Sequence, residues 1–358
     1  MKLILTGLLS FIGMHIFAQT DSTKNPLSIT GYTEIYYSYD FGNPSTHNRP
    51  SFLYSYNRHN EVNLNLGFVK AAWEKENVRA NLALAAGTYI NANLAGEPGV
   101  LKNIFEANAG VKISKKNNLW IDAGIFASHI GFESAIGKDC WNLTRSILAE
   151  NSPYYESGVK ISYTSPNEKW FISGLLLNGW QRIERVDGNN TPAFGHQLTW
   201  KPNSKITLNS SSFIGSDKPD STRQMRYFHN FYAIIQLSSK LGLTAGFDIG
   251  AEQKAKHSHQ FSSWYSPVII FKYAVNEKNS FAARAEYYCD KYGVIIGTGT
   301  IHGFKTFGYS LNYDNQIRDN IVWRIEARTL SSKDDIFLKN KTAIDNNTFL
   351  TTSLAISF

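Results

Sequence analysis

The sequence predicts an all-β fold: a single transmembrane, antiparallel, up-and-down β-barrel of about sixteen strands, with short periplasmic turns and long extracellular loops. Three observations support this prediction. Segments of roughly ten residues alternate apolar and polar side chains with a period of two. Short and long connections alternate along the chain. After the N-terminus the chain has no run of ~18 apolar residues, which a membrane-spanning helix would need.

Most of the predicted strands carry one apolar and one polar face. In LSITGYTEIYYSYD, the apolar face holds Leu27, Ile29, Ile35 and Tyr37, and the polar face holds Ser28, Thr30, Glu34 and Ser38. VRANLALAAG, LGLTAGFDIGAE, FAARAEYYCD and IVWRIEARTL alternate in the same way, whereas WFISGLLLNGW and FGHQLTW do so poorly. The strands of a soluble β-sandwich also alternate apolar and polar residues. The lengths of the connections must therefore distinguish a sandwich from a membrane barrel.

The connections favour the membrane barrel. The short turns span residues 74–77, 115–118, 166–169, 202–204, 238–240, 276–279 and 314–320. The long, polar connections span residues 41–59, 89–103, 130–154, 181–194, 215–226, 253–262, 291–302 and 331–346. Seven turns and eight loops predict sixteen strands, and an even number places both ends of the barrel on the periplasmic side.

The tryptophans give a second indication of a membrane barrel. Seven of the eight lie near predicted strand ends: Trp73, Trp120, Trp170, Trp180, Trp200, Trp264 and Trp323. Tryptophan gathers at membrane interfaces, because its ring is apolar while its N–H needs a partner. We therefore predict aromatic girdles at both ends of the strands.

The N-terminus predicts export and the domain boundaries. Lys2 precedes an apolar stretch from Leu3 to Phe17, and Ala18 is a small residue at a plausible cleavage site. We interpret residues 1–18 as a signal peptide, because the stretch is short for a membrane anchor. Residues 19–26 form a short periplasmic segment, and residues 27–358 form the barrel.

The composition and motifs exclude several classes of function. The formal net charge is +7, but lysine and arginine are scattered in an exported chain, so nucleic-acid binding is not expected. Cys140 and Cys289 are expected to be free thiols. His257 and His259 lie in a long loop without an obvious third ligand, so we predict no metal site and no cofactor. The sequence contains no recognisable catalytic motif.

The third long connection is the strongest candidate for a functional loop. Barrels of ~16–18 strands enclose an aqueous channel, and this connection, residues 130–154, is the longest. It carries Glu133, Asp139, Arg145 and Glu150 beside apolar residues, and NLTRSILAEN could form a short helix with Asn142 as N-cap. We expect the loop to fold into the lumen with its charges facing the pore, the alternative being a lid over the mouth.

Charged residues on the predicted inner wall are candidates for lining the pore. The basic ones are Arg79, Lys112, Arg284, Arg324 and Arg328, and the acidic ones are Glu34, Glu106, Asp122, Asp248, Glu286 and Glu326. Inward placement is favoured because Arg or Lys on the lipid side costs ~2–4 kcal/mol at mid-bilayer. The two signs nearly balance, which predicts weak ion selectivity. Alternatively, these charges pair with each other and stiffen the wall.

One region resembles a known family. The stretches NNLWIDAGIFASHIGFES and WNLTRSILAENSPYYESGVKISY are similar to the OmpL-like β-barrel porin family. The resemblance is most specific between Asn118 and Tyr163 and diffuse elsewhere in the mature chain. It implies an outer-membrane porin and supplies no catalytic motif.

Three functions follow as hypotheses. The first is a passive channel for small hydrophilic solutes and ions in the cell outer membrane. The second is an adhesion or structural barrel that binds through its loops, and the third is a barrel hydrolase, which would need a Ser, a His and an acidic group converging on one rim. Outer-membrane lipid is an expected partner, and a homo-oligomer is left open.

The last predicted strand, TTSLAISF, places Thr352, Leu354, Ile356 and Phe358 on the lipid side. We expect this strand to pair with the first and close the barrel. An alternating strand that ends on an aromatic residue resembles the signal read by the barrel-assembly machinery. Phe358 is therefore the predicted assembly signal, and that machinery is a further expected partner.

Overall fold

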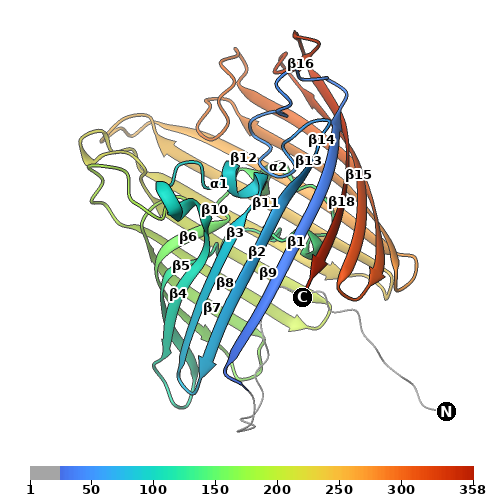
Figure 1. Cartoon of the computed structure of the whole chain (residues 1–358). Helices are drawn as coiled ribbons and strands as arrows, with labels where there is room; N and C mark the ends of the chain where they lie inside the picture. The colour runs from blue at the N-terminus through green and yellow to red at the C-terminus, as the bar shows by residue number, and fades with distance from the viewer. Residues whose placement is uncertain (1–24) are drawn as a thin grey trace, which may run out of the picture.

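Sixteen antiparallel strands close into one barrel in the computed structural model, which describes residues 25–358 (Figure 1). Fold class and strand number are confirmed. The predicted signal peptide, residues 1–18, and residues 19–24 of the predicted periplasmic segment lie outside the described residues. The long connections gather at one end of the barrel and the short turns at the other (Figure 1).

The barrel strands follow the order of the chain, each pairing with the next. They are β1 (Leu27–Asp40), β2 (Val62–Lys75), β3 (Val78–Ala86), β4 (Ile104–Lys112), β5 (Asn118–Ala127), β6 (Tyr155–Thr164), β7 (Trp170–Leu177), β8 (Ala193–Asn203), β9 (Ile206–Gly215), β10 (Arg226–Gln236), β11 (Leu241–Gln253), β12 (Phe261–Ala274), β13 (Asn279–Asp290), β14 (Phe304–Arg318), β15 (Ile321–Ser332) and β18 (Asn346–Ser357).

The long connections contain a few short elements. These are the helices α1 (Thr88–Asn93) and α2 (Ile147–Glu150), the 3₁₀ turns η1 (Gly99–Asn103), η2 (Gly137–Asp139) and η3 (Asp220–Thr222), and a hairpin of β16 (Phe337–Lys339) and β17 (Thr342–Ile344). Among the residues that the structure describes, no helix is both long and apolar enough to span a bilayer.

Pairing between β1 and β18 closes the ladder. Tyr32 lies opposite Ser357 and the register continues to Asp40 opposite Phe349. Beyond that register, the Gly31 amide donates to the Phe358 carbonyl at 2.7 Å, and the Phe358 amide donates to the Gly31 carbonyl at 3.0 Å. A Cβ added to Gly31 would come within 2.3 Å of the Phe358 ring, so the ring lies directly on this glycine. The final strand therefore pairs with the first, as its sequence predicts.

The two faces of the wall differ in chemistry as the alternation predicts. Large apolar side chains such as Leu311, Phe271 and Leu354 are exposed on the outer face. Polar and charged side chains such as Asn312 and Ser353 are buried on the inner face. A wall of this kind suits lipid outside and polar groups inside.

The predicted tryptophan girdle is correct only in part. Trp73, Trp170, Trp200 and Trp323 lie on the outer face near the short turns, each 36–38% exposed. Trp120 and Trp264 instead point inward and are 7% and 1% exposed. Their positions in sequence did not reveal the face.

The reason for the inward position differs between these two residues. The Arg79 guanidinium lies over the Trp120 ring at 4.1 Å. Trp264 occupies the space left by Gly250, where an added Cβ would approach the ring to 2.1 Å. Partners on the inner wall therefore hold both rings.

An apolar cluster lies inside the long-loop end of the barrel. It joins inward-facing strand residues such as Phe213, Phe304 and Phe349 to loop residues such as Phe52 and Phe337. Phe52 and Phe304 pack edge to face with ring centroids 4.8 Å apart. The loops at this end are thus folded into the barrel and pack against its wall.

Deleting Phe358 is expected to impair barrel formation, because two hydrogen bonds and the ring over Gly31 are lost at the closing seam. The measurement is the fraction of protein that reaches the outer membrane in a heat-modifiable, folded form. Phe358→Tyr keeps the ring and serves as control. The prediction fails if the deletion inserts as well as the unaltered protein but conducts less per inserted molecule.

Candidate functional site

The third long connection, which we call L3 (residues 128–154, between β5 and β6), lies against the inner face of β13–β15. Among residues 25–358, no strand pairs with L3 to satisfy its backbone N–H and C=O groups. Side chains from the far wall take that role. The residues of β13–β15 that contact L3 backbone groups are Arg284, Glu286, Asn312, Arg324, Glu326 and Arg328.

Arg324 fixes the first half of L3. Its guanidinium makes a two-pronged ion pair with Asp314 at 2.7 and 3.0 Å. The remaining N–H groups donate to the carbonyl oxygens of Gly137 at 2.6 Å and Cys140 at 2.9 Å. One buried arginine thereby joins two strands to the loop.

Two strand carboxylates fix the second half of L3. Glu326 accepts the backbone N–H of Thr144, and Glu286 accepts that of Ile147 at 2.6 Å. The Leu143 amide donates to the side-chain oxygen of Asn312 at 3.0 Å. Three amides of the buried segment 143–147 thus receive acceptors from the wall.

Arg284 and Arg328 balance these carboxylates. Arg284 pairs with Glu326 at 3.0 Å, and Arg328 pairs with Glu286 at 2.6 Å. Each arginine also donates to a carbonyl of L3: Arg284 to Thr144 at 2.6 Å, and Arg328 to Arg145 at 2.8 Å. We call the six wall residues Arg284, Glu286, Asp314, Arg324, Glu326 and Arg328 the anchor.

The predicted helix in L3 starts later than the sequence suggested. α2 begins at Ile147, and its N-cap is Ser146, whose hydroxyl accepts from the Ala149 amide at 3.4 Å. Asn142 does not cap it. Its side chain donates to Ser310 at 3.1 Å, which holds it against the wall.

The structure places the predicted loop charges differently from the expectation that all face the pore. Glu133, Arg145 and Glu150 are buried, whereas Asp139 is exposed. Arg145 donates to the carbonyls of Ser134, Leu143 and Ala135, all within L3. The buried loop needs these charges for its own backbone, so they hold its shape.

The two buried glutamates of L3 serve neighbouring backbone. Glu133 accepts from the Ser146 amide at 3.0 Å. Glu150 accepts from the amides of Tyr54 at 2.9 Å and Ser55 at 3.2 Å in the first long loop. Burial raises the pKa of both carboxyls. The contacts of Glu150 join the first loop to L3.

The opposite wall carries charges that keep partial contact with solvent. On β2–β5, Lys70 pairs with Glu106 and Arg79 pairs with Asp122, both at 2.6 Å. The Lys70 and Arg79 side chains are 27% and 29% exposed, whereas Arg284 and Arg328 are 0% exposed. Any water-filled path therefore has accessible charge on this side of L3.

The sequence assigned the inner face correctly to Glu34, Lys112 and Asp248 as well. Glu34 is buried and accepts from the Tyr56 hydroxyl at 2.9 Å. Asp248 accepts from the side chain of Asn230. Sequence reasoning missed Asn312 and Lys70, although their positions on the inner face follow from the same alternation. It assigned Asp314 to a short turn, but β14 continues to Arg318 and includes it. It also missed Ser146, which lies within L3.

Cys140 and Cys289 are both free thiols, as predicted. Cys140 is buried in L3, and its burial raises the pKa of the thiol to about 11. The thiol therefore stays protonated and shielded while L3 is in place.

Comparisons with known proteins match this architecture. A family model described as "Putative beta-barrel porin-2, OmpL-like" matches residues 26–358. A search of curated proteins found no match.

Solved structures with the same fold include three bacterial membrane proteins. The anion-selective porin from Comamonas acidovorans has 8% identity and a TM-score of 0.60, covering 93% of this chain and 99% of that chain. OmpT of Vibrio cholerae in a trimer form has 8% identity and a TM-score of 0.59, and the match covers 93% of this chain and 99% of that chain. The outer membrane channel DcaP of Acinetobacter baumannii has 9% identity and a TM-score of 0.60, and the match covers 93% of this chain and 97% of that chain.

Glu326→Ala is expected to loosen L3, because it leaves Arg284 without one buried partner and Thr144 without its acceptor. Removing one member of a buried ion pair costs about 3–5 kcal/mol. The readout is the rate at which a maleimide labels Cys140 in a Cys289→Ser background. We expect this rate to rise at least tenfold, because a loss of this size makes L3 leave the wall more often and expose the thiol.

Asp122→Ala in the same background is the matched control, because it breaks an ion pair on the opposite wall that does not contact L3. Equal labelling rates in the two variants would show that the anchor does not hold the loop.

Proposed function

Because the chain belongs to the OmpL-like family of β-barrel porins, which covers residues 26–358, we propose that it is a passive, water-filled channel for small hydrophilic solutes and ions in the outer membrane. The observation that carries the proposal is the position of L3, bound along the inner wall of a sixteen-stranded barrel. A barrel of this size leaves room for an aqueous channel beside such a loop.

In this proposal L3 narrows the channel. L3, held by the anchor, covers the β13–β15 wall, so the passage runs along β2–β6. Its accessible charges include Lys70, Arg79, Glu106 and Asp122, in two ion pairs of opposite sign. Paired charges of both signs favour weak ion selectivity.

The proposal needs no catalytic step. The family and the fold favour a channel over an enzyme. Outer-membrane lipid would surround the exposed apolar face, and the barrel-assembly machinery would read the last strand with Phe358. A homo-oligomer is part of the proposal, because a similar structure, OmpT of Vibrio cholerae, is described as a trimer form.

The purified, folded protein should give discrete conductance steps in a planar bilayer. In a salt gradient, the reversal potential should lie close to zero, because both signs of charge line the proposed path. A folded protein that gives no conductance contradicts the channel, and a strong preference for anions or cations contradicts weak selectivity.

Replacing residues 133–149 with a short Gly–Ser linker should widen the channel, since it removes the segment that lies across the lumen. Single-channel conductance should rise roughly twofold or more, as expected for an unobstructed barrel of this strand number. Liposome swelling should then admit larger sugars. Shortening residues 183–191 in the fourth loop is the control, and it should leave the sugar size limit nearly unchanged.

A further inference from the structure

Four polar side chains form a cluster on the outer, lipid-side face of the barrel. His196 lies on β8, Ser210 and Ser212 lie on β9, and His229 lies on β10. They alternate with inward, buried neighbours such as Ser211. Ser212 hydrogen-bonds His196, Ser210 hydrogen-bonds His229 at 2.9 Å, and the two imidazole centroids are 5.5 Å apart.

This polar cluster lies inside the apolar band of the wall. Outward-facing apolar residues border it on both sides: Phe194, Ile214 and Tyr227 toward the long loops, and Leu198, Leu208 and Phe231 toward the short turns. His196 lies four residues along β8 from Trp200, about 13 Å at strand spacing. The band is ~25 Å tall, so the cluster is well within it.

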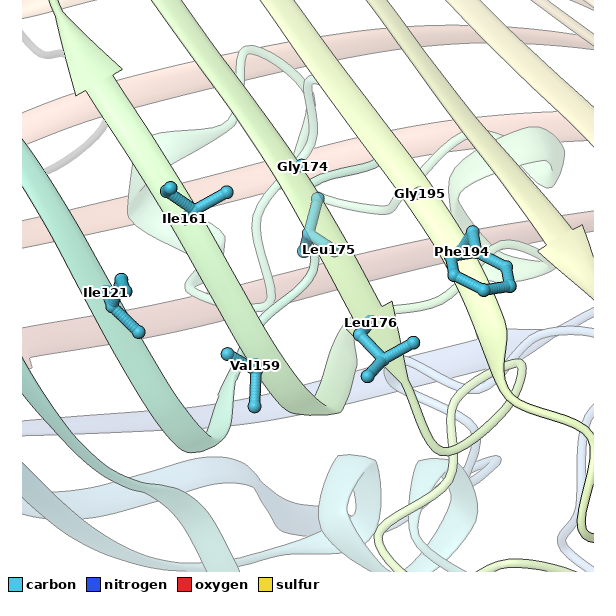
Figure 2. A pocket seen from close by; sticks show the side chains of 8 residues that line it. All are labelled: Ile121, Val159, Ile161, Gly174, Leu175, Leu176, Phe194 and Gly195. Atoms are coloured by element: carbon cyan, nitrogen blue, oxygen red, sulfur yellow. The ribbon is translucent and has the colours of Figure 1, made fainter.

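An apolar hollow adjoins the cluster on the same outer face. Its volume is about 380 Å³, and its walls include Ile121, Val159, Ile161, Leu176 and Phe194 (Figure 2). The hollow exists partly because one lining residue, Gly174, has no side chain to fill it.

Gly174 connects the hollow to the polar cluster. It lies between Ile161 on β6 and His196 on β8 in the ladder. A Cβ built on Gly174 would meet a single neighbour, the Ile161 Cγ2 atom at 3.7 Å. The polar cluster therefore opens directly onto an unfilled space large enough for a side chain of a partner.

Lipid is a poor partner for this cluster. The acyl chains at this depth neither donate nor accept hydrogen bonds, and the polar parts of lipids stay at the interface. A protein can bring polar side chains to mid-membrane depth, where they hydrogen-bond across the contact. Serine and histidine can each donate and accept, so this cluster is complementary to another copy of itself. A symmetric contact between identical chains requires such self-complementarity.

We propose that the outer face of β7–β10 is the surface through which two copies of this chain associate. The symmetry axis passes close to Ser212, and His196, Ser210, Ser212 and His229 face the same residues of the neighbour. The hollow over Gly174 receives an apolar side chain of that copy. This assignment rests on the homo-oligomer of the proposed function and specifies it as a two-fold dimer, whereas OmpT of Vibrio cholerae is described as a trimer form.

The experiment compares this face with β14, where the outer face carries Leu311, 59% exposed. In a Cys289→Ser background, Ser212→Cys and Leu311→Cys are oxidised in native outer membranes. Ser212→Cys should give a disulfide-linked dimer, and Leu311→Cys should stay monomeric. A missing dimer for Ser212→Cys, or equal cross-linking of the two variants, overturns the proposal.

A second comparison tests association without cross-linking. Ser212→Trp and Leu311→Trp both place an indole on the lipid side, and heat-modifiable migration reports folding. In mild detergent, the unaltered protein and Leu311→Trp should have an oligomer mass, and Ser212→Trp should have a protomer mass. An oligomer mass for Ser212→Trp overturns the proposal.

Conductance measurements on the same variants distinguish a failure of the proposed interface from a failure of the proposed channel. A monomeric Ser212→Trp that still conducts supports the interface and leaves the channel intact. A protein that cross-links through Ser212→Cys without conducting supports the interface and contradicts the proposed function alone.

Discussion

Buried backbone N–H and C=O groups need hydrogen-bond partners, and the barrel wall and L3 obtain them in two different ways. Within the wall, a closed antiparallel ladder satisfies the strands, which is the solution available to β-structure in lipid. The seam between β1 and β18, extended by Gly31 and Phe358, completes it. Inside the lumen no strand of the described chain pairs with L3, and polar and charged side chains of β13–β15 and of L3 itself supply the partners instead.

The second solution explains why so many charges are buried in the barrel. Arg324, Glu326 and Glu286 each contact both the opposite member of an ion pair and the L3 backbone. A buried ion pair is weak evidence for stability by itself, because desolvation offsets the attraction. Here the pairs fix the position of a loop, and the position of that loop sets the proposed width of the channel.

Alternation predicted the strands, the inner face and the closing pair, because membrane and lumen impose opposite chemistry on the two faces. It could not predict which inner charges would be covered, since that depends on contacts more than a hundred residues apart, such as Thr144 with Glu326. For the same reason Asn142 was assigned as a cap, although its partners lie on β14 and β15. Trp120 and Trp264 show that strand-end position does not determine the face.

The two segments with the poorest alternation, WFISGLLLNGW and FGHQLTW, contribute Gly174 and His196 to the outer face. Their weak pattern therefore marks the place where the outer wall is least suited to lipid. In a membrane barrel, a strand whose apolar and polar residues do not alternate thus indicates an outer surface that contacts something other than lipid.

The most direct test of the central claim, that strand charges hold L3 inside the lumen, is an experimental density map of the protein in a lipid bilayer. The account predicts density for residues 133–149 along the inner face of β13–β15, with the Arg324 guanidinium between Asp314 and the Gly137 carbonyl. Density for this segment above the mouth of the barrel, with Arg324 facing open lumen, would contradict it.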